Sequence, residues 1–128
     1  TKSPFLVEIR AMADPRFRTI KIKTGVVRRL AKEKTVYERE AEQQKIRIEK
    51  LKKDGRDEYE IRKQEEVLTE SLMMVPDCQR RLLTAYDDLK GILDTEQDLK
   101  DTEDYLAAKK VLEEAKQQLP KAGEVHML

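Results

Sequence analysis

The sequence predicts an all-α protein, an elongated antiparallel three-helix bundle in a single domain. Its 128 residues are enough for one domain. Charged residues make up 41% and aromatic residues 5%, with no tryptophan, which suits helices that each bury one stripe rather than a thick globular core. Apolar residues also recur at helical spacing in three segments that are separated by turn signals.

The first helix is expected over residues 15–52. Asp14 can accept hydrogen bonds from the free N–H groups of the first turn, and Pro15 fits the first helical position. Gly55 suits the left-handed residue that ends a helix, and the basic residues before it suit the negative helix end. The expected apolar stripe, with polar interruptions at Glu33 and Gln44, comprises Ile22, Val26, Leu30, Tyr37, Ala41, Ile48 and Leu51.

The second helix is expected over residues 57–94, with Asp57 as its cap and Glu60 completing a capping box. Pro76 would ordinarily end it. Helical spacing nevertheless continues across the proline, and no good cap precedes it, so the sequence predicts one helix kinked at Pro76. The residues in phase are Ile61, Leu68, Leu72, Val75, Gln79, Leu82, Tyr86, Leu89 and Leu93.

Residues 94–104 contain a single apolar residue, so a turn is expected there. Asp101 or Thr102 can then cap a third helix over 102–118, which would carry Leu106, Leu112, Ala115 and Leu119 before Pro120. A long parallel coiled coil is the rival architecture. Gly55, Pro76 and the loss of the apolar stripe near residue 98 favour the folded-back bundle instead.

The two ends of the chain are expected to lie outside the bundle, which would span residues 12–119. Met12-Ala13-Asp14-Pro15 reads like a natural start, so residues 1–11 are interpreted as a disordered leader from an expression vector or from upstream translation. Residues 120–128 are expected to form a flexible tail.

Charge and cysteine content exclude several classes of protein. With 27 basic and 26 acidic residues, there is no global field to attract DNA or an anionic membrane. One cysteine cannot form an internal disulfide, and no apolar run approaches the roughly 20 residues of a membrane helix. The N-terminal residues do not form a signal peptide. We therefore expect a soluble cytoplasmic protein.

Catalytic groups are scarce. His126 is the only histidine and falls in the predicted tail, where no triad or metal cage could hold it. Cys78 is interpreted as a small core residue, with a redox thiol as the less favoured alternative. The sequence lacks the glycines of a phosphate-binding loop and the ligand order of an EF-hand. We expect a non-enzyme without cofactor, nucleotide or metal.

Two clusters remain as candidate binding surfaces. The first is basic and comprises Lys21, Lys23, Arg28, Arg29, Lys32 and Lys34. A solvated face paired with neighbouring acids is its simplest interpretation; an acidic protein surface is a better partner for it than nucleic acid, because no aromatic residues are interleaved. The second cluster surrounds Pro76, over residues 72–81. Packing is favoured there over an adaptable, methionine-rich docking surface, and Arg80 and Arg81 are either surface charges or partner contacts.

The second cluster also carries a family resemblance. Residues 70–82, Glu-Ser-Leu-Met-Met-Val-Pro-Asp-Cys-Gln-Arg-Arg-Leu, resemble the signature of tubulin-binding cofactor A. Residues 12–16 and 20–30 resemble the same family, and the similarity covers residues 12 to about 118. Leu72 is a departure, since the animal family is expected to have Arg at this position. The departure implies either an altered surface or different packing at the kink.

The resemblance implies a three-helix rod that acts in the tubulin-folding pathway. Members of the family capture β-tubulin released from the cytosolic chaperonin and stabilise it before heterodimer assembly with α-tubulin. The resemblance further implies indirect cooperation with other tubulin-folding cofactors, no nucleotide or metal, and a cytoplasmic, cytoskeleton-associated location. Animal members look monomeric and a fungal relative is dimeric, so a monomer is expected here while the oligomeric state stays open.

Our hypothesis for the binding site combines the two clusters. Arg28, Arg29, Lys32, Arg80 and Arg81 are expected to meet an acidic surface on β-tubulin. Two other functions compete with this one. A generic helical coiled-coil scaffold would self-associate stably and show no preference for tubulin. A nucleic-acid binder would show salt-sensitive retention on DNA or RNA.

Overall fold

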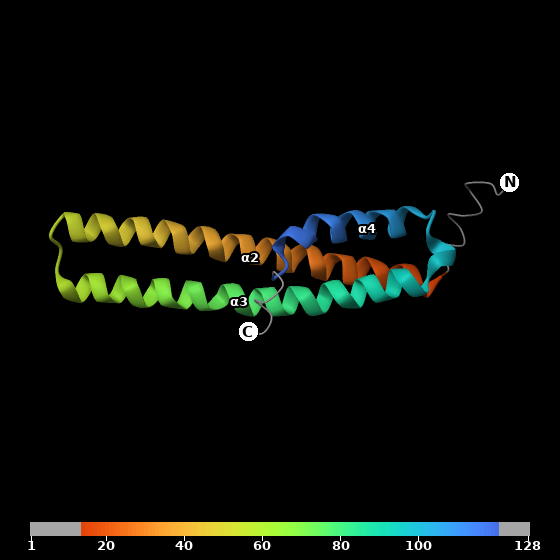
Figure 1. Ribbon diagram of the computed structural model, residues 1–128, viewed down its shortest axis with the longest axis horizontal. Helices are drawn as coiled ribbons and strands as arrows, with labels where there is room; N and C mark the ends of the chain where they lie inside the picture. Colours follow the sequence, from red (N-terminus) through yellow and green to blue (C-terminus); the bar gives the residue numbers. More distant parts are fainter. Residues whose placement is uncertain (1–13, 121–128) are drawn as a thin grey trace.

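A computed structural model describes residues 14–120 of the chain. It contains α2 (Pro15–Lys53), α3 (Glu58–Thr95), the 3₁₀ turn η1 (Gln97–Leu99), α4 (Glu103–Ala115) and the 3₁₀ turn η2 (Lys116–Gln118), and no strand among the described residues (Figure 1). The two long helices form an antiparallel hairpin, and α4 turns back along part of it. The predicted all-α three-helix rod is confirmed. The expectations for residues 1–11 and 121–128 lie outside the described residues, and the division of the chain into a bundle and flanking segments stays a prediction.

The predicted capping residues are present at the starts of the helices, but the Glu60 carboxylate pairs with Arg56 at 3.2 Å instead of completing the predicted capping box. The Asp14 carboxylate accepts a hydrogen bond from the Arg16 N–H at 2.9 Å, and Asp57 accepts one from the Tyr59 N–H at 3.3 Å. Thr102, rather than Asp101, caps α4. At the tip of the hairpin Gly55 has φ 67°, the left-handed conformation that glycine adopts without a Cβ penalty.

Helix α3 runs without interruption past Pro76, as the spacing predicted. Proline lacks the N–H that would bond the carbonyl one turn earlier, so packing of the residues after it helps to keep the helix continuous. Cys78 and Leu82, just after the proline, are fully buried. The kink itself stays a prediction.

One cluster forms the hydrophobic core. Within the described residues it includes thirteen of the sixteen buried hydrophobic side chains, and all thirteen lie at one end of the rod. The members are Phe17, Ile20, Val27, Leu30, Leu82, Leu89, Leu93, Leu99, Tyr105, Ala108, Val111, Leu112 and Ala115.

Three residues of the predicted stripes are exposed: Ile22, Leu106 and, in the second helix, Leu72 at 43%. Ile22 is 55% exposed and Leu106 is 53% exposed. Ile22 lies two residues beyond the fully buried Ile20, and two residues turn a helix by about 200°, which points Ile22 away from the core. Leu106 follows the buried Tyr105 and is turned away by about 100° in the same way. Spacing alone allowed either phase, because apolar residues also occur on the outer faces.

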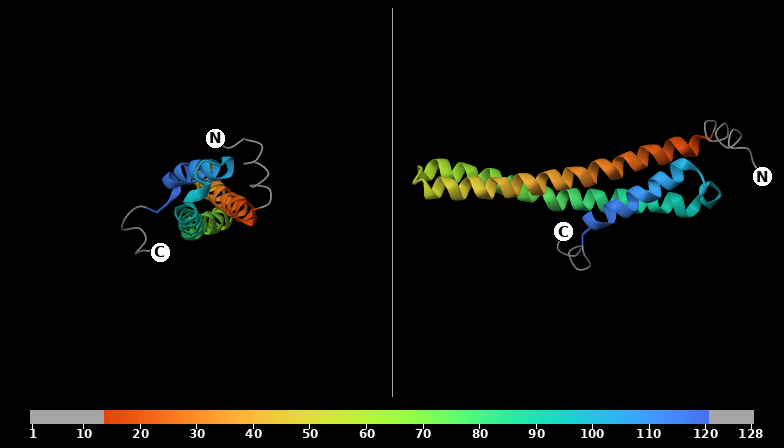
Figure 2. Two further views of the ribbon diagram at one scale, coloured as in Figure 1. Left: turned by 90° about the vertical axis from the view of Figure 1, so that its right-hand side faces the viewer. Right: turned by 90° about the horizontal axis from the view of Figure 1, so that it is seen from above.

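The rod therefore has two parts. The three-helix half consists of residues 15–35 of α2, residues 76–95 of α3, and α4 with its flanking turns. The two-helix arm consists of residues 36–53 and 58–75, where α2 and α3 continue alone (Figures 1 and 2). The boundary is marked by the buried Lys34, whose Nζ donates to Oε1 of Gln118 at 3.1 Å and pairs with Glu38 at 3.3 Å.

Candidate partner-binding surface

An open groove of about 540 Å³ runs along the junction of α2 and α3 in the three-helix half. We call it the seam groove. Three of the five predicted contact residues line it, namely Arg29, Arg80 and Arg81. The other lining residues are Val26, Leu30, Glu33, Asp77, Thr84, Ala85 and Asp88.

The seam groove lies on the side of the hairpin away from α4. On α2, Lys21 pairs with Asp104 of α4 at 3.9 Å, whereas Lys23 pairs with Asp88 of α3 at 2.6 Å. Residues two apart on a helix point in nearly opposite directions. Asp88 lines the groove and Asp104 does not, so α4 covers one side of the α2–α3 hairpin and the seam groove occupies the other.

The charges of the seam groove balance. Three arginines and three carboxylates line it. Asp77 accepts from both Arg80 and Arg81 at 3.0 Å, and Arg29 lies 3.9 Å from Glu33 on the next turn of α2. The arginines that the sequence grouped into a basic site therefore belong to a neutral, mixed-charge rim in the structure.

The remaining two predicted residues point elsewhere. Arg28 and Lys32 are exposed and do not line the seam groove. Arg28 precedes Arg29 by one residue and so is turned from it by about 100° around α2, and Lys32 lies one turn further along the same face as Arg28. Neither makes an ion pair with any described residue. The structure thus separates the five predicted residues into two neighbouring surfaces.

The acidic half of the rim and its apolar floor were missed by the sequence analysis. A signal for the acids existed: Asp77 precedes Arg80 and Arg81 by three and four residues, the spacing of helix ion pairs. A hairpin that turns at residues 54–57 also places Glu33 across from this segment. The apolar floor gave no comparable signal, because Val26, Leu30 and Ala85 fit an ordinary core stripe equally well.

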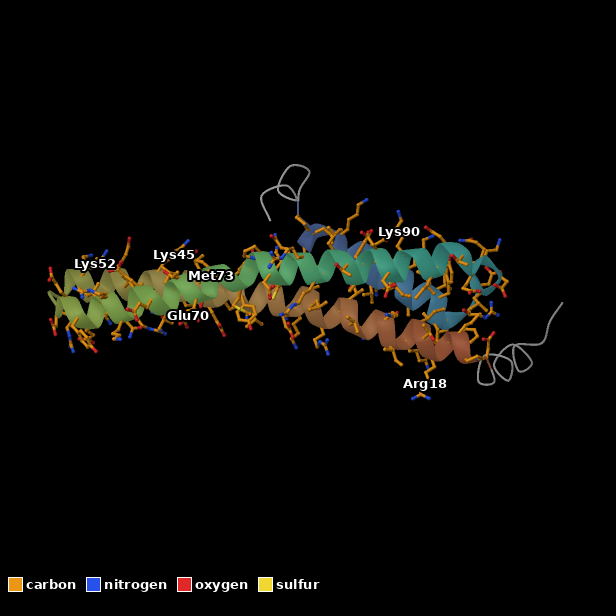
Figure 3. All side chains as sticks on the ribbon, turned by 90° about the horizontal axis from the view of Figure 1, so that it is seen from below. Arg18, Lys45, Lys52, Glu70, Met73 and Lys90 are labelled. Carbon is orange, nitrogen blue, oxygen red and sulfur yellow. The ribbon has the colours of Figure 1, made fainter. Side chains whose placement is uncertain are left out.

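The segment around Pro76 is partly packed and partly exposed. Val75 and Met74 are half-buried and Cys78 is buried, in agreement with packing. Leu72 and Met73 are 43% and 67% exposed, so the start of the cluster contributes to the surface of the two-helix arm, where Figure 3 labels Met73. The proposed consequence of Leu72 for the surface is therefore compatible with its position.

Cys78 behaves as a core residue. Burial raises the pKa of its thiol above the usual value, and the carboxylates of Glu33 and Asp77 add to the increase. A raised pKa keeps the thiol protonated and unreactive at neutral pH. Among residues 14–120, no three His, Cys, Asp or Glu side chains are placed to hold a metal ion. None of the described helices is sufficiently long and apolar to cross a membrane. His126 lies outside the described residues.

Comparison with known proteins agrees with this architecture. The family model for tubulin binding cofactor A matches residues 15–112. Tubulin-specific chaperone A of Mus musculus is 58% identical over 105 residues, covering 82% of this chain and 97% of the relative.

Two solved structures are similar in fold and in sequence. The human tubulin chaperone cofactor A structure has a TM-score of 0.70 at 56% identity, covering 80% of this chain and 99% of that one. The crystal structure of tubulin folding cofactor A from Arabidopsis thaliana has a TM-score of 0.73 at 37% identity, covering 80% and 96%. Together with the family match, these likenesses show that the chain belongs to the tubulin-binding cofactor A family of tubulin-folding chaperones.

Proposed function

We propose that this chain captures β-tubulin after its release from the cytosolic chaperonin and keeps it available for heterodimer assembly with α-tubulin. The observation that carries the proposal is the likeness to tubulin-specific chaperones over nearly the whole length of those relatives. The chain would act in the cytoplasm, as a binding protein rather than as an enzyme.

The shape and surface of the rod support such a role. Its long helices expose dense charge of both signs, and its open groove has an apolar floor with polar rims. Polar complementarity favours fast association and partner selection more than maximal affinity. A folding cofactor needs that balance, because it must release β-tubulin to the next step.

We propose that all five predicted residues contact β-tubulin, through two surfaces. Arg28 and Lys32 form an exposed basic pair without intramolecular ion pairs among the described residues, and suit an acidic surface. Arg29, Arg80 and Arg81 would contribute from the rim of the seam groove. The double variant R28E/K32E should weaken β-tubulin binding while circular dichroism stays native. A matched control is K109E/K110E on the exposed face of α4.

Light scattering coupled to size-exclusion chromatography tests the function. The chain is run alone and then with β-tubulin freshly released from the chaperonin. A stoichiometric complex with β-tubulin supports the proposal. A stable self-assembly that ignores β-tubulin would refute it and favour a scaffold without tubulin specificity. Equal binding by R28E/K32E and wild type would refute the basic pair alone.

A further inference from the structure

We propose that the seam groove receives an amphipathic helix of the captured partner, about three turns long, with a narrow apolar stripe and flanking charges of both signs. The inference rests on the proposed capture of β-tubulin and specifies how this partner is held.

The position of the seam groove on the rod suits a helix. α4 packs against one side of the α2–α3 hairpin and contacts both long helices there. The opposite side carries the seam groove, which no α4 residue lines. A helix packing there would complete a four-helix arrangement around the two long helices, the geometry by which amphipathic helices bind in grooves.

The length of the groove sets the length of its occupant. On α3 the lining residues run from Asp77 to Asp88, which corresponds to about 16 Å at 1.5 Å per residue. A helix of roughly eleven residues, or three turns, spans that distance. α4, which packs on the other side, has 13 residues, so the two sides accept helices of similar length.

The chemistry of the groove sets the composition of its occupant. Val26, Leu30 and Ala85 give a narrow apolar floor. The rim alternates in sign, with Arg29 and Glu33 on α2 facing Asp77, Arg81 and Asp88 on α3. Because these rim charges are already paired within the chain, a purely acidic segment would gain little attraction there and would meet three carboxylates. A helix with both signs of charge beside its apolar stripe matches the rim.

A charge swap tests whether the order of charges along the rim matters for binding. R29E/E33R keeps the net charge and the i, i+4 ion pair of α2 but reverses the order of charge along the rim. We expect it to weaken β-tubulin binding by roughly tenfold or more. The control E42K/K45E swaps an exposed pair on the two-helix arm and should stay within about twofold of wild type.

Filling the groove tests its apolar floor independently. Ala85→Trp places a large side chain over the floor and should reduce binding to the same extent, whereas Ala107→Trp on the exposed face of α4 should not. If Ala85→Trp proves unstable, the charge swap still decides the question. Wild-type affinity in both groove variants, with wild type itself bound to β-tubulin, would overturn the groove proposal alone. Failure of wild type to bind would instead overturn the proposed function.

The nature of the occupant is tested by a photo-reactive residue at Thr84, which lines the groove and is exposed. Cross-links to a β-tubulin segment with apolar residues at helical spacing support the proposal. Cross-links to an acidic segment without that spacing would contradict it. A dimer of the chain alone that dissociates in R29E/E33R would assign the groove to a second copy and overturn it as well.

Discussion

The three-helix half and the two-helix arm are built from the same two helices, yet they bury very different amounts of apolar surface. In the arm, the buried side chains of α2 are Ala41, Gln44 and Ile48, and residues 58–75 of α3 contribute none that is fully buried. All members of the hydrophobic core cluster lie in the other half. Two helices alone share one seam, whereas a third helix adds two more and encloses the space between them.

The surface of the arm also shows that little of its apolar area is buried. Of seven large hydrophobic residues that are exposed within the described chain, five lie in the arm: Ile46, Tyr59, Val67, Leu72 and Met73. Its interior also contains a polar contact, in which Nε2 of Gln44 donates to the carbonyl and to Oε1 of Gln64 at 2.9 and 2.7 Å. We infer that the three-helix half stabilises the fold and holds the seam groove rigid, while the arm opens more readily.

The largest contrast should come from matched leucine truncations. Leu89→Ala removes a fully buried core side chain and should lower the free energy of unfolding by about 3 kcal/mol, since it leaves a cavity. Leu68→Ala removes a half-buried side chain from the arm and should cost only about 1 kcal/mol. Urea unfolding followed by circular dichroism measures both. Equal costs would break the distinction between the two parts.

Gln44 offers a way to strengthen the arm. Gln44→Ala leaves a gap and removes the contact to Gln64, so unfolding should become easier by about 1–2 kcal/mol. Gln44→Leu fills the gap with apolar volume and should be neutral or stabilising, because the half-buried Gln64 can turn to water. Thermal unfolding of the two variants decides this. A strongly destabilised leucine variant would mean that the polar contact, rather than packing, holds the arm together.

Glycine-to-alanine substitutions should have opposite effects on stability at the two ends of the rod. Gly91 lies in α3 in the three-helix half, exposed and with nothing near the position of an added Cβ, so Gly91→Ala should stabilise the protein by about 1 kcal/mol. Gly55, at the tip of the arm, has positive φ, so Gly55→Ala should cost about 1 kcal/mol of local strain. Thermal melts and hydrogen exchange at residues 50–60 measure the two effects. Loss of stability in Gly91→Ala would contradict the helical packing described for this end.

The smallest expected effect is on the loss of folding stability at acidic pH. At the end of the three-helix half, Arg16 bonds Asp14, Glu96 and Asp98. The hydrogen bonds from Arg16 lower the pKa of Asp14 below its usual value. A lowered pKa means that the contribution of Asp14 to stability is present above its unfolded pKa of about 3.9 and is lost as the pH falls through the lower folded value.

Asp14→Asn tests this contribution, since it keeps a capping oxygen but removes the charge. The drop in Tm between pH 7 and pH 2.5 should be smaller in the variant than in the wild type. An unchanged drop would show that the ion cluster at this end of the rod does not couple folding to acid.

Much of the fold followed from local signals in the sequence. Asp14, Asp57 and Thr102 marked the starts of helices, and Gly55 marked the turn between the long ones. The continuation of α3 past Pro76 followed from unbroken spacing. The orientations of Ile22 and Leu106 could not be predicted from the sequence. The outer faces of the helices also carry apolar residues, and spacing alone does not show which apolar residues face a neighbouring helix.

The point along α2 at which the third helix stops covering it is also marked in the sequence, although helical spacing alone does not show it. Every seventh residue on the side of α2 toward α4 is Phe17, Thr24 and Ala31 in the three-helix half, and these are buried or half-buried. The same series continues in the arm as the exposed residues Glu38, Lys45 and Lys52. A change from small or apolar to charged residues at one heptad position shows where a covering helix stops.

The candidate partner-binding surface was less accessible to sequence reasoning. The sequence grouped Arg29, Arg80 and Arg81 into a basic site, but this basic appearance was misleading, because Asp77 neutralises part of the charge across one helical turn. Linear proximity also grouped Arg28 with Arg29, which a helix separates. Such surfaces depend on the register between two helices, and no single segment contains that information.

Hydrogen exchange of the free chain, resolved by peptide, tests the division of the rod most directly. We expect the slowest exchange in residues 20–30 and 82–93, and exchange at least roughly tenfold faster in residues 40–50 and 62–72. Equal protection along both long helices, or greater protection in the arm, would contradict it.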